Sequence, residues 1–276
     1  MAASETIVHL SKKLIPSAMH LNLAANWNQT PEDWERILKL EPEGCFGLFC
    51  DGTLVSTTTA ICYGQELAWV GMVLTDPAYR GRGYARILME RALEFVAQRG
   101  VAWVKLDATD MGRPLYLKLG FEDEAPVERW MAQAPAEIRP CDLPIYEPNH
   151  TLDLEAFGAC RCALLSTLAT VEAVSLPGEG FAMARPGSRA AYFGPCVTRT
   201  PEAARRFLQW FLARHPRELV AWDILPNNLE AVRLAKEFGF ERRRELVRMV
   251  RPGPSAFGPF AHNDSYVFAI AGFEYG

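Results

Sequence analysis

A glycine-rich hexapeptide, Arg80-Gly81-Arg82-Gly83-Tyr84-Ala85, lies between an unbroken apolar run and an amphipathic stretch. The run covers residues 67–74, and apolar residues then recur at helical spacing from Ala85 to Val96. The pattern predicts a strand, a tight turn and a helix. Such a turn directs backbone N–H groups and the positive end of a helix dipole at one point, as phosphate binding requires. Since glycine pairs also form ordinary tight turns, the neighbouring residues must decide.

The length and composition indicate a globular protein of one large or two ordinary domains. The 276 residues exceed the usual size of about 100–200 residues for one domain. Hydrophobic residues make up 49% and charged residues 22%, as in soluble proteins. No apolar stretch approaches the ~18 residues that span a membrane, and residues 1–13 lack the pattern of a secretion signal. We therefore expect a cytoplasmic protein.

The net charge and the cysteines exclude several partner classes. A net charge of −4 gives no general attraction to nucleic acid or to an anionic membrane, so any anion bound at the hexapeptide is expected to be small. The seven cysteines lack the paired spacings of a zinc site or a disulfide framework, and we expect them to be buried thiols. Cys160 and Cys162 are so close in sequence that a simple disulfide between them would be strained. We expect no metal site.

Apolar periodicity and turn residues predict a mixed α/β fold. The turn Asp51-Gly52 is a strong hairpin signal within a three-strand antiparallel meander. In the first half we expect strands at residues 7–10, 45–50, 54–62, 67–74, 103–106 and 128–132, and helices at 16–27, after Thr30, from 85 to about 100, and at 112–119. In the second half we expect helices at 154–168 and 203–213, strands at 180–183, 190–193 and 219–224, and then a helix and two strands.

A proline-rich segment and an internal echo divide the chain in two. Prolines punctuate residues 135–150, which predicts a semi-rigid linker between domains at 1–134 and 151–276. Gly120-Phe121 recurs as Gly239-Phe240, and the apolar pattern from Ala85 recurs from Ala204, both displaced by 119 residues. A shared displacement at two separate places indicates duplication, although two α/β patterns can also coincide by chance.

A second motif, Leu115-Tyr116-Leu117-Lys118-Leu119-Gly120-Phe121, closes the predicted helix at 112–119. Together with the apolar strand and the hexapeptide, it resembles the GNAT superfamily of acetyl-CoA-dependent N-acetyltransferases over about residues 5–133. The segments Trp27–Thr30 and Leu106–Thr109 are similar to those of a bacterial subgroup with a second, degenerate GNAT-like domain. The resemblance implies two GNAT-like domains, each with a mixed, largely antiparallel sheet flanked by helices.

The resemblance also implies how coenzyme A is bound. Main-chain N–H groups of the loop would hold its pyrophosphate, while the preceding strand would pair with its pantetheine arm and could polarise the thioester carbonyl. The cofactor-binding residues implied in this way are Val73, Leu74, Thr75, Arg80, Gly81, Arg82, Gly83, Tyr84, Ala85, Arg86 and Thr109. Thr109 departs from the family, where an asparagine commonly binds the pantetheine.

Tyr116 matches the family tyrosine that protonates the departing thiolate of coenzyme A. A tyrosine that only packs the end of the helix is the alternative. In the second half the matching position is Ala235, and Pro201-Glu202 replaces Arg82-Gly83, so an N–H donor is lost and a carboxylate is gained. We therefore expect Thr200 to begin an ordinary capped helix, and the second domain to form a wall of the acceptor cleft or replace the second subunit of a dimer.

The acceptor site is less clearly marked in the sequence. Asn28 and Gln29 would line the cleft by resemblance, or cap a turn. Asp107 is the nearest candidate to hold or deprotonate an amine, and capping of the turn from Asp107 to Thr109 is an equal alternative. Glu66 lies only at the edge of its strand. Weaker candidates, each better suited to an exposed loop, are Asp223, His262, Asp264 and Glu274. No residue is an obvious general base.

The interpretation that fits these residues is an N-acetyltransferase that transfers the acetyl group from acetyl-CoA directly to a primary amine. A non-catalytic CoA-binding or regulatory module is the alternative, and an enzyme of another nucleotide-binding fold is disfavoured because no Gly-Lys-Ser/Thr follows the glycines. The acceptor is expected to be a small-molecule or protein amine, with no nucleic acid or membrane partner, and the protein to be a monomer or a homodimer.

Overall fold

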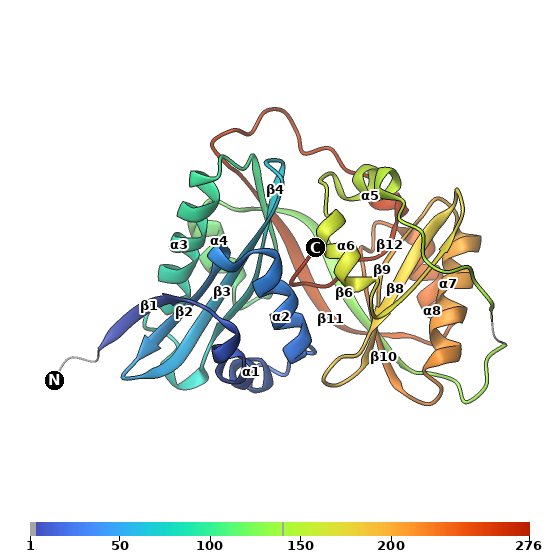
Figure 1. Ribbon diagram of the computed structural model, residues 1–276, viewed down its shortest axis with the longest axis horizontal. Helices are drawn as coiled ribbons and strands as arrows, with labels where there is room; N and C mark the ends of the chain where they lie inside the picture. Colours follow the sequence, from blue (N-terminus) through green and yellow to red (C-terminus); the bar gives the residue numbers. More distant parts are fainter. Residues whose placement is uncertain (1–3, 140) are drawn as a thin grey trace.

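The computed structural model describes residues 4–139 and 141–276, which form two lobes joined by one twelve-stranded mixed sheet (Figure 1). The strands of the first lobe are β1 (Glu5–His9), β2 (Cys45–Cys50), β3 (Thr53–Tyr63), β4 (Leu67–Thr75), β5 (Trp103–Ala108) and β6 (Glu122–Gln133). Its helices are α1 (Ile15–Ala24), α2 (Pro31–Leu40), α3 (Tyr84–Gln98) and α4 (Arg113–Lys118).

The second lobe repeats much of this order. Its strands are β7 (Glu172–Leu176), β8 (Gly180–Arg185), β9 (Ala191–Thr198), β10 (Leu219–Ile224), β11 (Glu241–Pro252) and β12 (Val267–Ala269). Its helices are α5 (His150–Phe157), α6 (Cys162–Leu168), α7 (Pro201–Arg214) and α8 (Leu229–Glu237). Four short 3-10 helices lie at Lys12–Leu14, Pro42–Gly44, Pro77–Tyr79 and Asp264–Tyr266.

The two lobes exchange their long strands. The sheet order is β1-β2-β3-β4-β5-β11-β6-β10-β9-β8-β7, with β12 beside β9. Strand β11 of the second lobe therefore lies between β5 and β6, and β6 in turn pairs with β10 of the second lobe. In Figure 1 these two strands run side by side between the lobes. Neither lobe completes its own hydrogen-bond ladder without a strand of the other.

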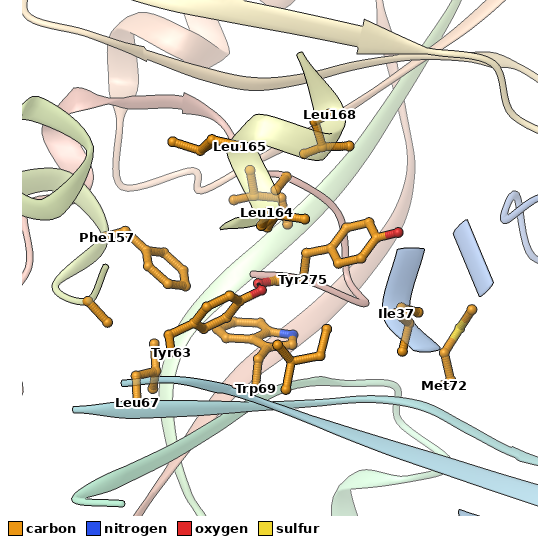
Figure 2. Packing of buried hydrophobic residues seen from close by; sticks show 14 of the residues in the cluster. Ile37, Tyr63, Leu67, Trp69, Met72, Phe157, Leu164, Leu165, Leu168 and Tyr275 are labelled. Atoms are coloured by element: carbon orange, nitrogen blue, oxygen red, sulfur yellow. Dashed lines mark hydrogen bonds between the residues drawn. The ribbon is translucent and has the colours of Figure 1, made fainter. Parts of the chain in front are cut away.

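Each face of the sheet in the first lobe packs in its own apolar core. Helix α3 packs on one face through Leu88, Met89 and Ala92, against Val55 and Val70 of the sheet. The opposite face is covered by α1, α2, α5, α6 and the segment after β12. Figure 2 shows the second core, where Tyr63, Leu67 and Trp69 of the sheet pack beneath Phe157, Leu164 and Tyr275.

Buried ion pairs add polar links within and between the lobes. Arg185 of β8 donates hydrogen bonds to Asp33 of α2 (3.1 Å) and to Glu274 (2.7 Å). Arg161, between α5 and α6, is 2% exposed and pairs with Asp153 through Nη2 at 2.9 Å. Charges buried to this degree need their partners, because an isolated ion in the interior loses its hydration without compensation.

The expected strands and helices of the first half are present, with ends that differ by a few residues. The single helix expected at 154–168 is wrong, because α5 ends at Gly158 (φ 85°), where an added Cβ would lie 2.3 Å from the carbonyl oxygen of Ala261. Strand β7 was not predicted. The segment between Ala134 and α5 holds a single β-bridge, from Ile145 to Val174. The division at residues 135–150 stays a prediction.

The expectation that the cysteines are buried thiols is wrong for four of them. Cys45, Cys50 and Cys196 are buried, whereas Cys160 is exposed and Cys62, Cys141 and Cys162 are partly exposed. Cys160 and Cys162 flank the buried Arg161 at the turn between α5 and α6. None of the helices in the described ranges is long and apolar enough to cross a membrane.

The exchange of β6 and β11 predicts a single unfolding transition for the whole chain. Opening either lobe breaks the ladder of the other, so the lobes cannot unfold one after the other at separate denaturant concentrations. Urea titrations followed by far-ultraviolet circular dichroism and by tryptophan fluorescence should superimpose. Two resolved transitions would contradict this coupling.

The Arg161–Asp153 pair predicts a large loss of stability on Asp153→Asn. The substitution keeps the shape of the side chain but leaves the buried guanidinium without its counter-charge, which should cost about 3–5 kcal/mol of unfolding free energy. The matched control is Glu237→Gln, whose partner Arg205 lies on the surface at α7, and this variant should unfold close to wild type. Equal unfolding midpoints for the two variants would contradict the prediction.

Candidate active site

A cleft of about 500 Å³ opens where β4 and β5 diverge. In these parallel strands, residues 67–69 of β4 pair with residues 103–105 of β5. Beyond this short ladder the carboxyl ends of the two strands separate. The cleft is lined by residues 70–75 of β4 on one side and by Leu106 and Asp107 of β5 on the other. The divergence therefore leaves main-chain groups of two strands facing an open space, which is how a sheet can bind an extended ligand.

A β-bulge in β4 lies at the centre of the cleft. The pairing with β3 shifts from Thr57–Leu74 to Thr59–Gly71, so Met72 and Val73 both lie opposite one residue. Met72 has a φ of 49°, which is rare for a residue with a side chain. The Thr57 hydroxyl donates to the Met72 carbonyl at 2.8 Å and holds this conformation. The bulge turns the main chain of Met72 and Val73 out of the ladder toward the cleft.

The loop before α3 presents unpaired N–H groups at the mouth of the cleft. Gly81 (φ 77°) and Gly83 (φ 84°) have left-handed conformations that other residues adopt only with strain. Helix α3 has no side-chain cap and no acidic residue in its first turn. Within the described residues, the N–H groups of 81–86 donate no hydrogen bond. The fifteen-residue helix therefore directs free donors and the positive end of its dipole at one point.

The side chains of this loop have different environments. The Arg80 guanidinium lies close enough to donate to the Thr75 carbonyl at 3.3 Å, and Arg86 pairs with Glu90 on the surface. The Arg82 guanidinium lies over the Tyr79 ring. Arg82 does not line the cleft, whereas Gly81 and Gly83 on either side of it do. The Tyr84 hydroxyl points into the protein and donates to Glu5 at 2.6 Å. The Tyr84 hydroxyl is therefore engaged within the protein, although the residue lines the cleft.

Tyr116 of α4 lines the cleft from the same side as the loop. Its side chain is 7% exposed and packs edge-on against Phe121. Gly112 allows the close approach, because an added Cβ there would lie 2.8 Å from the ring. Burial raises the pKa of Tyr116 above its usual range, so the phenol stays protonated at neutral pH. No protein group in the described residues hydrogen-bonds its hydroxyl, which leaves the proton available to a ligand.

The cleft connects the two faces of the sheet. Tyr84, Tyr116 and Leu106 belong to the core beneath α3. Met72, Val127 and Leu246 belong to the core on the opposite face. A ligand that enters from the α3 side can therefore meet another that enters from the opposite side, in the opening between β4 and β5.

The opposite end of the cleft includes residues that the sequence analysis did not predict. Trp27 and Gln29 come from the segment between α1 and α2. Residues at this end that the sequence did not indicate include Arg129 of β6, Arg244 and Leu246 of β11, and Phe273 near the carboxyl end. No pattern in the sequence indicates that β11 inserts beside β5, and without that insertion Arg244 and Leu246 have no relation to this cleft.

The three acceptor-site candidates have different surroundings. The Asn28 amide is used in hydrogen bonds with the backbone of Arg189 and Ala190, and this residue does not line the cleft. Gln29 lines the cleft, and its amide donates to Glu274 at 2.7 Å. Asp107 also lines it, but its carboxylate accepts two hydrogen bonds from Arg248 of β11, at 2.9 and 3.1 Å. Burial raises the pKa of Asp107, against the opposing effect of Arg248.

The four weaker candidates do not line the cleft. Asp223 is fully buried and accepts from Arg129 at 2.7 and 2.6 Å. Glu274 is 2% exposed and accepts from Arg185 and Gln29. His262 and Asp264 form a pair around a small separate pocket. Asp223 and Glu274 are therefore interior ion-pair partners, and not exposed loop residues.

Thr109 in the first lobe and Thr200 in the second lobe each accept a hydrogen bond from a nearby backbone N–H group. The Thr109 hydroxyl accepts from the Gly112 N–H at 3.2 Å and also lines the cleft. In the second lobe, Thr200 caps α7 as expected from the sequence, by accepting from the Ala203 N–H. The amino-terminal end of α3 has no side-chain cap, whereas the Thr200 side chain caps the amino-terminal end of α7.

The second lobe fills its own opening between parallel strands. Strands β9 and β10 pair over 191–193 and 220–222, and β12 then pairs with β9 at Cys196 and Val197. The Asn228 amide donates to the carbonyl oxygens of Ser265 and Val267, at 3.2 and 3.0 Å. The place that is open between β4 and β5 is therefore occupied here by the chain itself.

Comparison with known proteins identifies the same family in both halves. Residues 16–121 match the acetyltransferase (GNAT) family, and residues 150–266 match an acetyltransferase (GNAT) domain. An uncharacterized N-acetyltransferase of Bacillus subtilis is 24% identical over 228 residues, which cover 75% of this chain and 78% of that protein. An uncharacterized N-acetyltransferase of Methanocaldococcus jannaschii is 28% identical over 104 residues, which cover 34% of this chain and only 46% of that protein.

A solved structure shares the whole fold. The crystal structure of a Pyrococcus horikoshii protein, named as an acetyltransferase candidate, has a TM-score of 0.85. The match covers 99% of this chain and 96% of that one, at 23% sequence identity. At this identity the likeness shows the fold alone.

The free N–H groups before α3 predict a specific effect of Gly83→Glu on acetyl-CoA binding. The substitution strains the left-handed backbone and places a carboxylate beside the anion site, which should weaken binding at least about tenfold. The matched control is Gly239→Glu, because Gly239 has a similar φ of 78° and an equally open surrounding, but lies after α8. Calorimetric titration with acetyl-CoA measures both variants. Unchanged binding in Gly83→Glu would exclude this loop as the anion site.

Proposed function

Because the chain belongs to the GNAT superfamily of N-acetyltransferases and has a GNAT-like domain in each half, we propose that it transfers an acetyl group from acetyl-CoA to a primary amine. One observation carries this proposal. A single cleft joins the free N–H groups before α3, the bulged strand β4 and the buried Tyr116.

Acetyl-CoA enters the proposed reaction as a substrate, and the residues present fit its chemistry. The N–H groups of residues 81–86 and the dipole of α3 suit its pyrophosphate, with Arg80 nearby to balance charge. The main chain of Val73, Leu74 and Thr75 suits the amides of the pantetheine arm, as in strand addition to a sheet. The second lobe lacks this arrangement, since α7 is capped and β12 fills the opening there.

The reaction proceeds by direct attack. The neutral amine attacks the thioester carbonyl carbon, a carbon–nitrogen bond forms and the carbon–sulfur bond breaks. Tyr116 donates its proton to the departing thiolate, and the nitrogen loses its proton to water, from which the phenolate is reprotonated. The only carboxylate that lines the cleft in the described residues is Asp107, and Arg248 holds it. The protein therefore has no free general base at hand, and the amine is taken up in its neutral form.

The second lobe supplies the far wall of the acceptor end. Arg244, Leu246 and Phe273 line the cleft from this lobe, so one chain can complete the site without a second subunit. A monomer is therefore sufficient for the proposed reaction, and the acceptor is a small-molecule or protein amine that reaches the cleft from the face of α1 and α2.

A non-catalytic CoA-binding module is the alternative function. The lack of a free general base in the cleft favours it. It predicts binding of acetyl-CoA without thiol release in the presence of any amine. Screening amines with acetyl-CoA and following free thiol distinguishes the two functions. Amine-dependent thiol release, with the acetylated product identified by mass spectrometry, supports the enzyme, and binding without release supports the module.

The free hydroxyl of Tyr116 predicts a selective effect of Tyr116→Phe on turnover. The ring still packs against Phe121, but the proton donor is lost, so kcat should fall about a hundredfold. The Kd for acetyl-CoA should stay close to that of wild type. The matched control is Tyr79→Phe, which removes a hydroxyl from the loop side of the cleft. Unchanged kcat at saturating substrates would remove Tyr116 from the mechanism.

A further inference from the structure

Arg244 is an arginine without a partner at the acceptor end of the cleft. It lies on β11 opposite Arg129 of β6, and its side chain is partly buried. Within the described residues, no carboxylate or carbonyl group accepts a hydrogen bond from it or pairs with it. A guanidinium has five N–H donors and stays charged, so a half-buried one without an acceptor is suited to an anionic ligand.

The other arginines on this face already have carboxylate partners. Arg129 pairs with Asp223, Arg248 with Asp107 and Arg185 with Glu274. These pairs balance the buried carboxylates nearest the cleft and leave the positive charge of Arg244 in excess. Burial and the neighbouring charge of Arg129 both lower the pKa of Arg244, against the opposing effect of Asp223, so its positive charge is less well stabilised there than in water. A bound anion would offset this cost.

The position of Arg244 separates it from the donors that suit the phosphates of the cofactor. Leu246, which follows Arg244 on the same face of β11, packs in the core beneath α1 and α2. The loop before α3 and Tyr116 pack with the core on the other face. Arg244 therefore faces the side from which the acceptor enters, and the pyrophosphate has its own donors at residues 81–86.

We propose that the acceptor is a small amine that carries a carboxylate, such as a free amino acid, and that Arg244 binds this carboxylate. The inference rests on the proposed acetyl transfer and specifies its substrate class. Bidentate hydrogen bonds from a guanidinium fix a carboxylate in one orientation and so direct the amine of the same molecule toward the thioester.

The dimensions of the cleft suit a small acceptor. The volume of about 500 Å³ must hold both the acyl end of the cofactor and the acceptor. Phe273, with Arg129 stacked on its ring at 4.6 Å, and Trp27 form apolar walls at this end. A compact amino acid with an apolar or flexible side chain fits these walls, whereas a protein amine has no carboxylate beside it.

The first experiment compares matched amines with and without the carboxylate. L-methionine, L-phenylalanine and L-lysine are each tested beside the amine left after removal of the carboxylate, namely 3-(methylthio)propylamine, phenethylamine and cadaverine. Thiol release from acetyl-CoA gives kcat and KM, and calorimetry on the CoA-loaded protein gives Kd independently of turnover. We expect at least one amino acid to have a kcat/KM about tenfold or more above that of its decarboxylated partner.

The second experiment removes the charge of Arg244. Arg244→Met should raise the KM and Kd of the preferred amino acid about 10- to 100-fold, while the Kd of acetyl-CoA stays near wild type. It should not affect the decarboxylated amine, and Arg244→Lys should restore part of the loss. The matched control is Arg243→Met, because Arg243 is the exposed neighbour on β11 and pairs only with Glu241.

The outcomes separate this inference from the proposed function. Equal use of amino acids and decarboxylated amines, or acetylation of peptide amines alone, would overturn the inference and leave acetyl transfer intact. Weakened acetyl-CoA binding in Arg244→Met would also overturn it, by assigning Arg244 to the cofactor. Binding of amino acids that depends on Arg244, without any thiol release, would support the anion site and contradict the proposed function. Absence of both binding and turnover with all three amino acids would overturn the inference.

Discussion

The structure depends on the main-chain pairing of β11 with β5 and β6. This pairing joins the two lobes in one sheet and places second-lobe residues at the first-lobe cleft. It brings Arg248 against Asp107, so the carboxylate of Asp107 at the cleft is held in an ion pair. It also places Arg244 in the lining of the cleft. A sheet formed by the first half alone would have neither the charge nor the wall that define this end of the cleft.

The two lobes share a fold, and differences in capping and strand pairing separate their roles. At α3 the glycines leave N–H groups free, whereas at α7 a threonine side chain accepts a hydrogen bond from one. Between β4 and β5 the opening is empty of protein, whereas β12 occupies the matching place between β9 and β10. The second lobe therefore satisfies these groups with its own chain, and it contributes Arg244, Leu246 and Phe273 to the lining of the first-lobe cleft.

Local patterns predicted most of the first lobe, and errors arose where distant contacts decide the structure. The hexapeptide and the Asp51-Gly52 turn form as expected, because their backbone conformations depend on nearby residues. The helix expected at 154–168 is broken at Gly158, which caps α5 in a left-handed conformation and lies against Phe260 and Ala261 from far along the chain. Asn28 was a plausible acceptor residue in the sequence, but its amide binds the backbone near Ala190. Partners more than 100 residues away leave no periodic trace in the sequence.

The sequence by itself determined the family, the mixed α/β class and the glycine-rich loop before α3. It also singled out Tyr116 and indicated that the second half lacks such a loop. These features depend on residue types at short spacing, where backbone geometry and capping are local. Only the tertiary structure decided which strands pair across the lobes, and therefore which side chains line the acceptor end. The strand pairing also decides that Asp107 pairs with Arg248 and that Arg244 has no partner among the described residues. A charge is balanced by groups within hydrogen-bond distance, and these need not be its neighbours in the sequence.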